Sequence, residues 1–389
     1  MTDLRNPSEV QRNLAIDSIV NKEIIDYLPI NKEMDSRIFS RLLDDDKVVA
    51  SYKMYWLLGI LEEVSAGNTE IEFKKLIARM IVSAWYPQQQ FKLSFGFSDN
   101  LKKPIAYVAS QNIFANNCNE NELLDYLYKS EDKELNKMMK ELTFNVPYRL
   151  LSPFFKIIEF KNNLIVDLSQ KSETCLYKII KGKKDKIVIN DCWVDYLQGN
   201  YRVIKSWIYY KLICFLQKRN PNVPSIAFKL EAPKARKLKG ATDLWKKIIN
   251  VNGLKDIYTG VEFSDTAFHK YGGLSIDHFI PWSFVLHDQI WNLVPTFKNI
   301  NSKKSDKLLQ FDNYIEDFCG IQYKAFSYIC DKRIKNSLAE YMDVLNLENP
   351  SDFYKNSTKE SFSKNIKQCI SPLYQIALNQ GFQVMDRLV

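Results

Sequence analysis

All three histidines of the 389-residue chain fall within one short stretch, and the middle one, His278, directly follows Asp277. Asn292 and Asn301 come after this pair, and three lysines follow Asn301 closely. A carboxylate, an imidazole and amide side chains can together bind a divalent cation and activate water. One segment therefore carries the side-chain types that phosphodiester hydrolysis needs. The histidines and lysines of this segment are His269, His278, His287, Lys303, Lys304 and Lys307.

Each of these side chains has a natural task in such a reaction. His278 suits the general base, because an imidazole can accept a proton from water near neutral pH. Asp277 offers a hard carboxylate oxygen to Mg²⁺ or Mn²⁺, and the amide oxygen of Asn301 offers a second ligand. Few protein ligands are expected, because Mg²⁺ keeps water molecules and takes phosphate oxygens from its substrate.

The local pattern predicts the order strand, loop, strand, helix. Residues 274–280 and 289–294 are short apolar runs typical of strands, and Thr296 can cap a helix that runs to about residue 309. Neighbouring residues of a strand point to opposite faces. Asp277 and His278 can therefore serve one site only if the first strand twists or bulges at its end.

Residues 274–308 resemble the ββα-metal motif of the HNH endonucleases. They are similar in particular to the HNH domains of RNA-guided CRISPR nucleases and of bacterial restriction and defence nucleases. The likeness rests on Asp-His-x-x-Pro-x-Ser-Phe at 277–284, on the central Asn292, and on Asn-x-x-Lys-Ser-Asp at 301–306. Tyr258-Thr259-Gly260 also resembles a segment often found just upstream of that motif.

The resemblance implies a role for each matched residue. His278 would be the general base, Asp277 and Asn301 would hold the metal, and Asn292 would brace the loop through backbone hydrogen bonds. The implied reaction is Mg²⁺- or Mn²⁺-dependent hydrolysis of DNA that leaves 5′-phosphate and 3′-hydroxyl ends. The resemblance also implies a bacterial or phage source and a role in restriction or anti-phage defence.

The other polar residues near the motif allow two interpretations. His269 is expected in a loop, and His287 is either solvated or close to a phosphate. The three lysines that follow Asn301 form either a solvated helix face or a contact to the DNA backbone. Trp282 and Trp291 are expected in the core of this unit.

Two alternatives to a free-standing nuclease stay open. The chain could be a catalytically silent HNH fold that binds nucleic acid, although the complete set of Asp, His and Asn residues argues against that. It could also be a nuclease subunit that is active only in a larger complex, with its N-terminal half docked on an ATPase, a sensor or a guide complex.

Composition excludes several other classes of protein. Seven cysteines are present without any Cys-x-x-Cys pair, which supports neither a disulfide framework nor the structural zinc of many HNH proteins. The chain has no Gly-x-x-x-x-Gly-Lys phosphate loop, no apolar signal core and no run long enough to span a membrane. We therefore expect a cytoplasmic protein, without a membrane association, whose net charge of +8 is compatible with DNA.

A basic segment lies between the first half of the chain and the histidine cluster. Residues 229–247 hold seven basic and two acidic residues. Charge runs are usually solvated linkers, but the position beside the candidate site favours a contact to DNA. The residues expected to make this contact are Lys234, Arg236, Lys237 and Lys239.

The pattern as a whole predicts an α+β, mostly helical protein, with the HNH core between a helical or mixed N-terminal region and a helical C-terminal extension. Helices are expected at 51–64, 73–84 (with a capping box of Thr69 and Glu72 and an end at Pro87), 120–141, 201–218, 313–329 and 334–345, and strands at 154–158, 164–166 and 186–189. The expected domains are 1–150 (helical accessory), 151–220 (mixed α/β), 221–242 (basic linker), 243–310 (HNH core) and 311–389 (helical extension).

Overall fold

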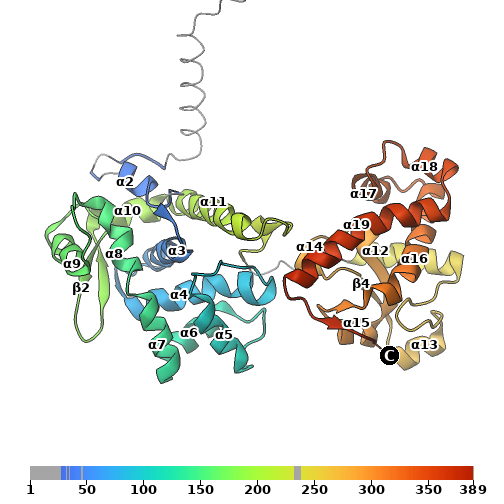
Figure 1. The fold of residues 1–389 in the computed structure, drawn as a ribbon, viewed down its shortest axis with the longest axis horizontal. Helices are drawn as coiled ribbons and strands as arrows, with labels where there is room; N and C mark the ends of the chain where they lie inside the picture. Colours follow the sequence, from blue (N-terminus) through green and yellow to red (C-terminus); the bar gives the residue numbers. More distant parts are fainter. Residues whose placement is uncertain (1–27, 32, 35, 45–46, 232–237, 389) are drawn as a thin grey trace, which may run out of the picture. The chain divides into compact units, whose positions relative to one another are not determined.

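The computed structural model describes residues 28–31, 33–34, 36–44, 47–231 and 238–388. It has the predicted α+β, mostly helical character, with three small sheets (Figure 1). The chain forms two compact units, one of Met1–Pro221 with Lys229–Ala232 and one of Asn222–Phe228 with Pro233–Val389. The boundary that the sequence suggested at residue 150 falls inside the first unit.

The first unit packs its helices around α3 and α4. Its elements are α2 (Ser36–Ser40), α3 (Tyr52–Ser65), β1 (Glu70–Glu72), α4 (Phe73–Trp85), the π-turn η2 (Tyr86–Gln90), α5 (Lys102–Ser110), α6 (Glu120–Lys129), α7 (Lys133–Leu142), α8 (Val146–Leu151), the 3₁₀ turn η3 (Ser152–Phe154), α9 (Asn162–Lys171), β2 (Tyr177–Ile180), β3 (Lys186–Ile189), α10 (Asp191–Gly199) and α11 (Tyr201–Arg219).

The two central helices were predicted well, but the reason given for the start of α4 was wrong. Thr69 and Glu72 form no capping box, because residues 70–72 pair with β3 and no side chain caps the helix. The backbone N–H of Phe73 instead donates to the carbonyl of Asp185. At the other end α4 stops at Trp85, and Pro87 lies in the π-turn that follows.

The sheet of this unit is antiparallel, in the order β1–β3–β2. Only one of the three expected strands, 186–189, exists. Residues 164–166 lie in helix α9, where Ile165, Val166 and Ser169 make a buried face at helical spacing. Residues 154–158 leave η3 as irregular chain with Ile158 exposed. Short apolar runs do not distinguish a strand from one turn of a buried helix face.

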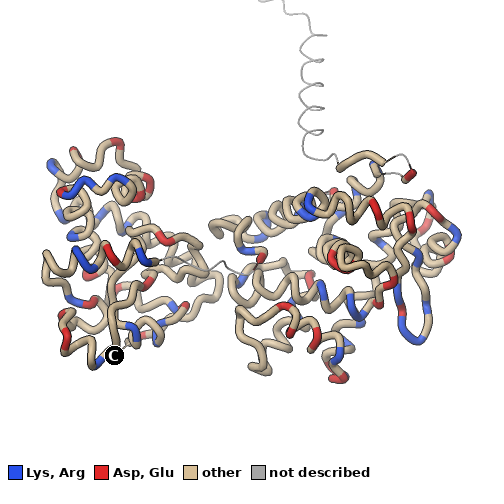
Figure 2. The backbone as a smooth tube through the Cα atoms, turned by 180° about the vertical axis from the view of Figure 1, so that it is seen from behind, with Lys and Arg blue, Asp and Glu red and all other residues tan. Residues whose placement is uncertain are grey.

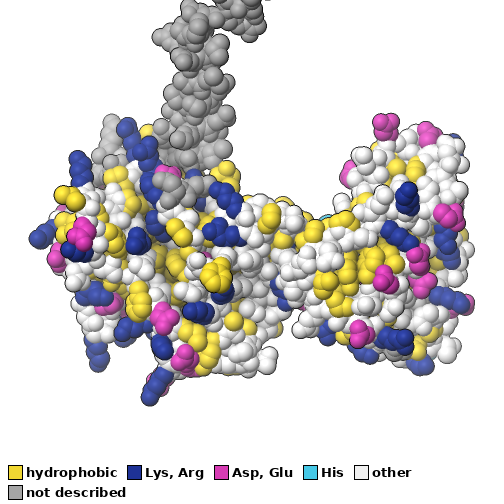
Figure 3. Space-filling view, in the orientation of Figure 1, with side chains coloured by type: hydrophobic (Ala, Val, Ile, Leu, Met, Phe, Trp, Pro, Cys, Tyr) yellow, Lys and Arg dark blue, Asp and Glu magenta, His cyan; other side chains and the backbone are white. Residues whose placement is uncertain are grey.

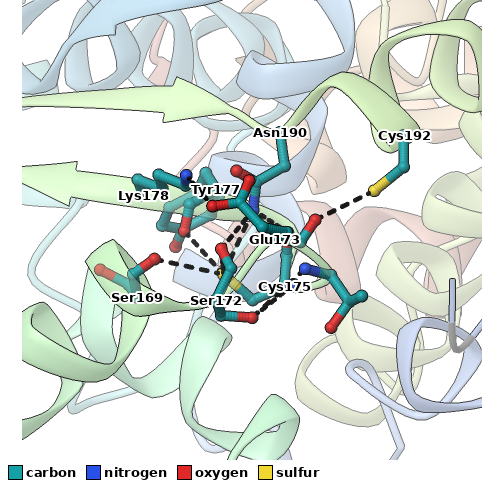
Figure 4. Close-up of polar contacts among 9 residues, drawn as sticks. Ser169, Ser172, Glu173, Cys175, Tyr177, Lys178, Asn190 and Cys192 are labelled. Carbon is teal, nitrogen blue, oxygen red and sulfur yellow. Dashed lines mark hydrogen bonds and ion pairs between the residues drawn. The ribbon is translucent and has the colours of Figure 1, made fainter.

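A polar cluster fixes the chain as it enters β2 (Figure 4). The Oγ of Ser169 accepts from the N–H of Ile179 at 3.0 Å, and the amide of Asn190 donates to the carbonyl of Cys175 at 2.6 Å. The thiol of Cys192 contacts the carbonyl of Glu173 at 3.4 Å. These bonds join α9, β2 and the start of α10. All seven cysteines of the chain are free thiols.

The expected helix at 120–141 is two helices, α6 and α7. The break lies at Ser130–Asp132, where the Asp132 carboxylate caps α7 by accepting from the N–H groups of Glu134 and Leu135. A carboxylate at this position satisfies N–H groups that have no partner within the helix. Helix α11 matches the prediction for 201–218 to within one residue.

The second unit surrounds one hairpin, β4–β5, with helices (Figure 1). Its elements are the 3₁₀ turn η4 (Ile226–Phe228), α12 (Lys239–Asn252), α13 (Asp265–Tyr271), β4 (Leu274–His278), α14 (Trp282–Val285), the 3₁₀ turn η5 (Ile290–Asn292), β5 (Leu293–Phe297), α15 (Lys298–Lys304), β6 (Leu308–Leu309), α16 (Phe311–Asp331), α17 (Lys335–Leu345), α18 (Pro350–Asn356), α19 (Lys359–Asn379) and β7 (Val384–Met385).

The C-terminal helices share one hydrophobic core with the hairpin. This core runs from Trp245 on α12 through Phe284 to Phe326 and Phe362 on the C-terminal helices. The end of the chain returns to the segment after α15, because β7 pairs in parallel with β6. Residues 311–388 are thus part of the unit that holds the candidate site.

Charged side chains are mixed over the surface. Figure 2 shows lysines along the loop between β2 and β3, where Lys181 pairs with Asp185 and Lys184 pairs with Glu72 at 2.9 Å. On the face drawn in Figure 3, basic side chains are scattered among acidic, hydrophobic and uncharged ones and form no continuous basic surface. None of the helices in the described part of the chain combines the length and apolar composition that crossing a membrane requires.

Candidate nuclease site

The two residues that open the motif are the last two of β4. Asp277 lies opposite Val294 and His278 opposite Leu293 in a regular antiparallel register, without an inserted residue. The sequence argument required a twist or a bulge at this end. The ladder contains no bulge, so only a twist of the strand end can bring both side chains to one site. Both side chains are buried, but they contact different groups: Asp277 contacts Tyr258 and helix α15, and His278 contacts the loop before η5.

The Asp277 carboxylate has two strong partners. The hydroxyl of Tyr258 donates to Oδ2 at 2.5 Å, and the ammonium of Lys304 lies 2.9 Å from the same oxygen and 3.2 Å from Oδ1. Lys304 also donates to the carbonyl of His278 at 2.7 Å. Burial, followed by the charge of Asp277, raises the pKa of Tyr258 well above its ordinary value, so this tyrosine remains a hydrogen-bond donor.

The imidazole of His278 pairs with a carboxylate. Its Nε2 lies 2.9 Å from Oδ1 of Asp288, and the two side chains are 5% and 32% exposed. The neighbouring His287 packs its ring against Trp291, with centroids 4.8 Å apart. Burial, and next the proximity of His278, lower the pKa of His287 to about 4. His287 is therefore a neutral, half-buried neighbour of the pair.

The fully buried Asn292 holds the turn after β4 to the start of β5. Its Oδ1 accepts from the N–H of Ile280 and its Nδ2 donates to the carbonyl of Ile280, both at 2.9 Å. Its own carbonyl accepts from the N–H of Phe279. An asparagine can satisfy one donor and one acceptor of the same residue in this way. This is the geometry that a loop brace requires.

Asn301 lies on α15, the helix that packs on both strands. Its Nδ2 donates to the Oγ of Ser275 at 2.8 Å and to the carbonyl of Ile276 at 3.1 Å. These bonds use the amide nitrogen and leave the amide oxygen at the other end of the group. Helix α15 starts after Phe297, not at a Thr296 cap, since Thr296 is buried in β5. It ends at Lys304 because Ser305 adopts φ 53° and residues 308–309 pair with β7.

The three lysines after Asn301 have different environments. Lys304 fits neither expectation, because its side chain is fully buried beside Asp277. Lys303 is exposed and donates to the carbonyl of Leu388 at 2.5 Å, and Lys307 is half-buried. In the basic segment, Lys239 is the exposed first residue of α12. Lys234, Arg236 and Lys237 lie outside the described residues.

The remaining residues near the motif are partly as predicted. His269 is exposed, but it lies on helix α13 instead of in a loop. Trp291 is buried, with its indole N–H donating to Gln289, whereas Trp282 is half-buried.

A divalent cation could bind here through few protein ligands. Among the described residues no group of three or more His, Cys, Asp or Glu side chains is placed to hold a metal ion. The side-chain oxygens beside α15 include the Asp277 carboxylate, which contacts Lys304, and the amide oxygen of Asn301. One carboxylate with a neutral oxygen fits an ion such as Mg²⁺, which retains water. Lys304 would have to share or release that carboxylate.

Comparison with known proteins identifies the segment just described. The family model of the HNH endonucleases matches residues 256–308, from the turn before Tyr258 to β6. The chain carries an HNH endonuclease domain. This family assignment supports nuclease activity on nucleic acid in general terms. No curated protein and no solved structure matches the chain.

The HNH domain contains side-chain contacts to Asp277 and His278 that the sequence analysis did not assign. Tyr258 was quoted only as part of the resemblance, and Lys304 only as a surface lysine. Asp288 was not considered, although it stands beside His287 in the loop between two predicted strands. A carboxylate in that loop is the one sequence signal that could have suggested a partner for His278.

Proposed function

We propose that the protein is a metal-dependent HNH endonuclease that hydrolyses DNA phosphodiester bonds. The observation that carries this proposal is the match of residues 256–308 to the HNH family. Within this segment His278 is the buried last residue of β4, and its ring contacts the Asp288 carboxylate. His278 takes the proton of the attacking water, a step that contributes typically about 10²–10⁴-fold in rate. Asn292 acts indirectly, because it fixes the backbone that follows His278.

Asp277 and Asn301 are the proposed metal ligands. A bound divalent ion would stabilise the negative charge that develops on the phosphate and the leaving oxygen. Mg²⁺ and Mn²⁺ suit these oxygen donors, and the resemblance to other HNH domains supports 5′-phosphate and 3′-hydroxyl products. Structural zinc is not part of this proposal.

DNA contacts are proposed for the basic residues around the site. Lys303, Lys307 and Lys239 have solvent-accessible side chains, and phosphate contacts from such residues add affinity without sequence information. Lys234, Arg236 and Lys237 complete the proposed contact. A role in bacterial restriction or anti-phage defence, and a cytoplasmic location, remain proposals from the sequence.

The state of Asp277 favours a second candidate function, that of a nuclease subunit activated within a larger complex. Its carboxylate is ion-paired with Lys304, so metal binding competes with a formed interaction. An ATPase, a sensor or a guide complex bound to the N-terminal unit is one way to change that balance. If the Asp277–Lys304 ion pair never released the carboxylate to a metal ion, the protein would be a catalytically silent nucleic-acid-binding module.

A cleavage assay separates these possibilities. The purified protein would be incubated with supercoiled, linear and single-stranded DNA and with RNA, with Mg²⁺, with Mn²⁺ and with EDTA. The proposal expects metal-dependent DNA cleavage that EDTA stops and added metal restores. Binding without cleavage under every condition, including addition of the protein's own co-purifying partners, would leave only the silent module. Cutting that survives EDTA would refute the metal assignment.

A further inference from the structure

We propose that Asp288 is the positioning residue of His278: it holds the proton on Nε2 and thereby makes Nδ1 the nitrogen that accepts the proton of water. The inference deepens the proposed nuclease function and rests on it. It concerns a residue that lies in the HNH segment without an assigned role.

The proton position follows from the chemistry of the two groups. An ionised carboxylate can only accept hydrogen bonds. The 2.9 Å contact between Nε2 and Oδ1 of Asp288 is therefore an Nε2–H donating to the carboxylate. In a neutral imidazole one nitrogen carries the proton and the other carries the lone pair. Nδ1 then has the lone pair and takes the proton of water. The water oxygen bonds to phosphorus as the bond from phosphorus to the 3′ oxygen breaks, and the leaving 3′ oxygen takes a proton from solvent to become the 3′-hydroxyl.

The loop that carries Asp288 is fixed at both ends. On one side Leu286 adopts φ 57° and its N–H donates to the carbonyl of Trp282 at 2.8 Å, which closes α14. On the other side the N–H of Ile290 donates to the carboxylate of Glu340 at 2.5 Å. Glu340 lies on α17, so the C-terminal helices help to set the place of Asp288. A carboxylate on a fixed loop can orient an imidazole, whereas one on a mobile loop cannot.

The groups near the His278–Asp288 pair contact other partners and do not compete for the Asp288 carboxylate. His287 is the nearest other ring; its Nδ1 accepts from the N–H of Gln289 at 3.4 Å, and its low pKa keeps it uncharged. The ammonium of Lys304 contacts the backbone carbonyl of His278 and the Asp277 carboxylate, not Asp288. Asp288 and His278 therefore form a separate pair from Asp277 and Lys304.

Nuclear magnetic resonance can test the tautomer without any cleavage. The 389-residue chain labelled with ¹⁵N at histidine gives three imidazoles, which His269→Ala and His287→Gln assign by elimination. At a pH where the ring is neutral, we expect His278 to carry its proton on Nε2. Asp288→Asn should move the population toward the Nδ1–H form, because its amide can donate to Nε2, and Asp288→Glu should keep the original form. An Nδ1–H tautomer in the wild type, or one unchanged by Asp288→Asn, would overturn the proposal.

Kinetics give the second readout. Asp288→Asn should lower kcat by about 10²–10⁴-fold, since the wrong tautomer removes the base, and should leave KM for DNA within a few-fold. Asp288→Glu should recover part of kcat. The exposed Asp312, changed to Asn, is the matched control and should cleave as the wild type does. A kcat for Asp288→Asn equal to the control would overturn the positioning role. A wild type that never cleaves would instead refute the proposed function, whatever the tautomer.

Discussion

The Nζ of Lys304 lies 2.9 Å from Oδ2 of Asp277, and the two side chains are 0% and 4% exposed. A buried ion pair of this kind gives modest net stability, but removing one partner leaves a charge without compensation. The pair joins the end of β4 to the end of α15, so it holds together the two elements that carry the proposed metal ligands. The same pair occupies the Asp277 carboxylate, so a metal ion that binds this carboxylate would have to weaken a contact that stabilises the HNH domain.

Lys304→Met should therefore destabilise the unit that holds the HNH domain by roughly 3–5 kcal/mol. Urea unfolding and hydrogen exchange of the β4 amides would measure the loss. Lys303→Met is the matched control, because Lys303 is exposed, and it should cost about 1 kcal/mol or less. Adding Asp277→Asn to Lys304→Met should restore part of the stability. Equal stability of the two lysine variants would contradict the account.

Asn292→Ala should lower the free energy of unfolding by roughly 2–4 kcal/mol. The substitution removes two hydrogen bonds and leaves the backbone N–H and carbonyl of Ile280 buried without those partners. Asn292→Asp should also destabilise, because it buries a charge and turns an oxygen toward the Ile280 carbonyl. The exposed Asn336, changed to Ala, serves as control. Thermal unfolding would show a lower melting temperature for Asn292→Ala than for the control. Equal melting temperatures would exclude the role of Asn292 as a brace of the Ile280 backbone.

The sequence was sufficient where periodicity and motif spacing agree. Helices α3, α4 and α11 have long apolar faces, and their predicted ranges match the structure within one or two residues. The HNH segment was recognised because Asp277, His278 and Asn292 occur at matched positions. Short runs were less reliable: residues 164–166 lie in a helix, although residues 186–189 form β3 as predicted. The strands β1 and β2, three and four residues long, were not predicted.

Partners within the site were harder to predict than the motif itself. From sequence alone, a lysine on a short helix is expected to be exposed to solvent. Only the packing of α15 on β4 places Lys304 beside Asp277. Asp288 meets His278 through the path of a loop, which depends on the Leu286 backbone and on Glu340 from a distant helix. Such contacts are set by tertiary structure, so one sequence does not reveal them.

Acid should destabilise the HNH unit through His287. Burial lowers its pKa in the folded chain to about 4, from an ordinary 6.5. As the pH falls, His287 binds a proton in the unfolded chain before it does so in the folded chain. The stability that comes from the neutral, buried His287 is therefore complete above the ordinary pKa and is lost progressively as the pH falls to the folded-state pKa. The loss should reach roughly 2–3 kcal/mol. Urea unfolding at several pH values should show it in the wild type and in His269→Gln but not in His287→Gln. The same pH dependence in all three proteins would contradict the assignment.

The basic segment should contribute affinity without chemistry. Each residue that contacts phosphate adds about 0.9 to the slope of log affinity against log salt on duplex DNA. Neutralising the four basic residues should flatten that slope and weaken binding equally on any sequence, while the rate at saturating DNA stays constant. The residues are Lys234, Arg236, Lys237 and Lys239, and the control set of exposed lysines is Lys332, Lys335, Lys355 and Lys359.

Binding measured over a range of salt concentrations decides this prediction. An unchanged slope would mean that the segment is a solvated linker. A loss of the rate at saturating DNA would instead place these residues within the active site.

The central claim is that His278 is the general base of a nuclease, and plasmid cleavage by His278→Ala tests it most directly. His269→Ala is the matched control, because His269 is an exposed histidine of the same unit. Both variants should fold and bind DNA as the wild type does. Single-turnover cleavage with Mg²⁺ or Mn²⁺ should fall by about 10²–10⁴-fold for His278→Ala and remain at the wild-type rate for His269→Ala. A His278→Ala protein that cuts within a few-fold of the wild-type rate would contradict the account.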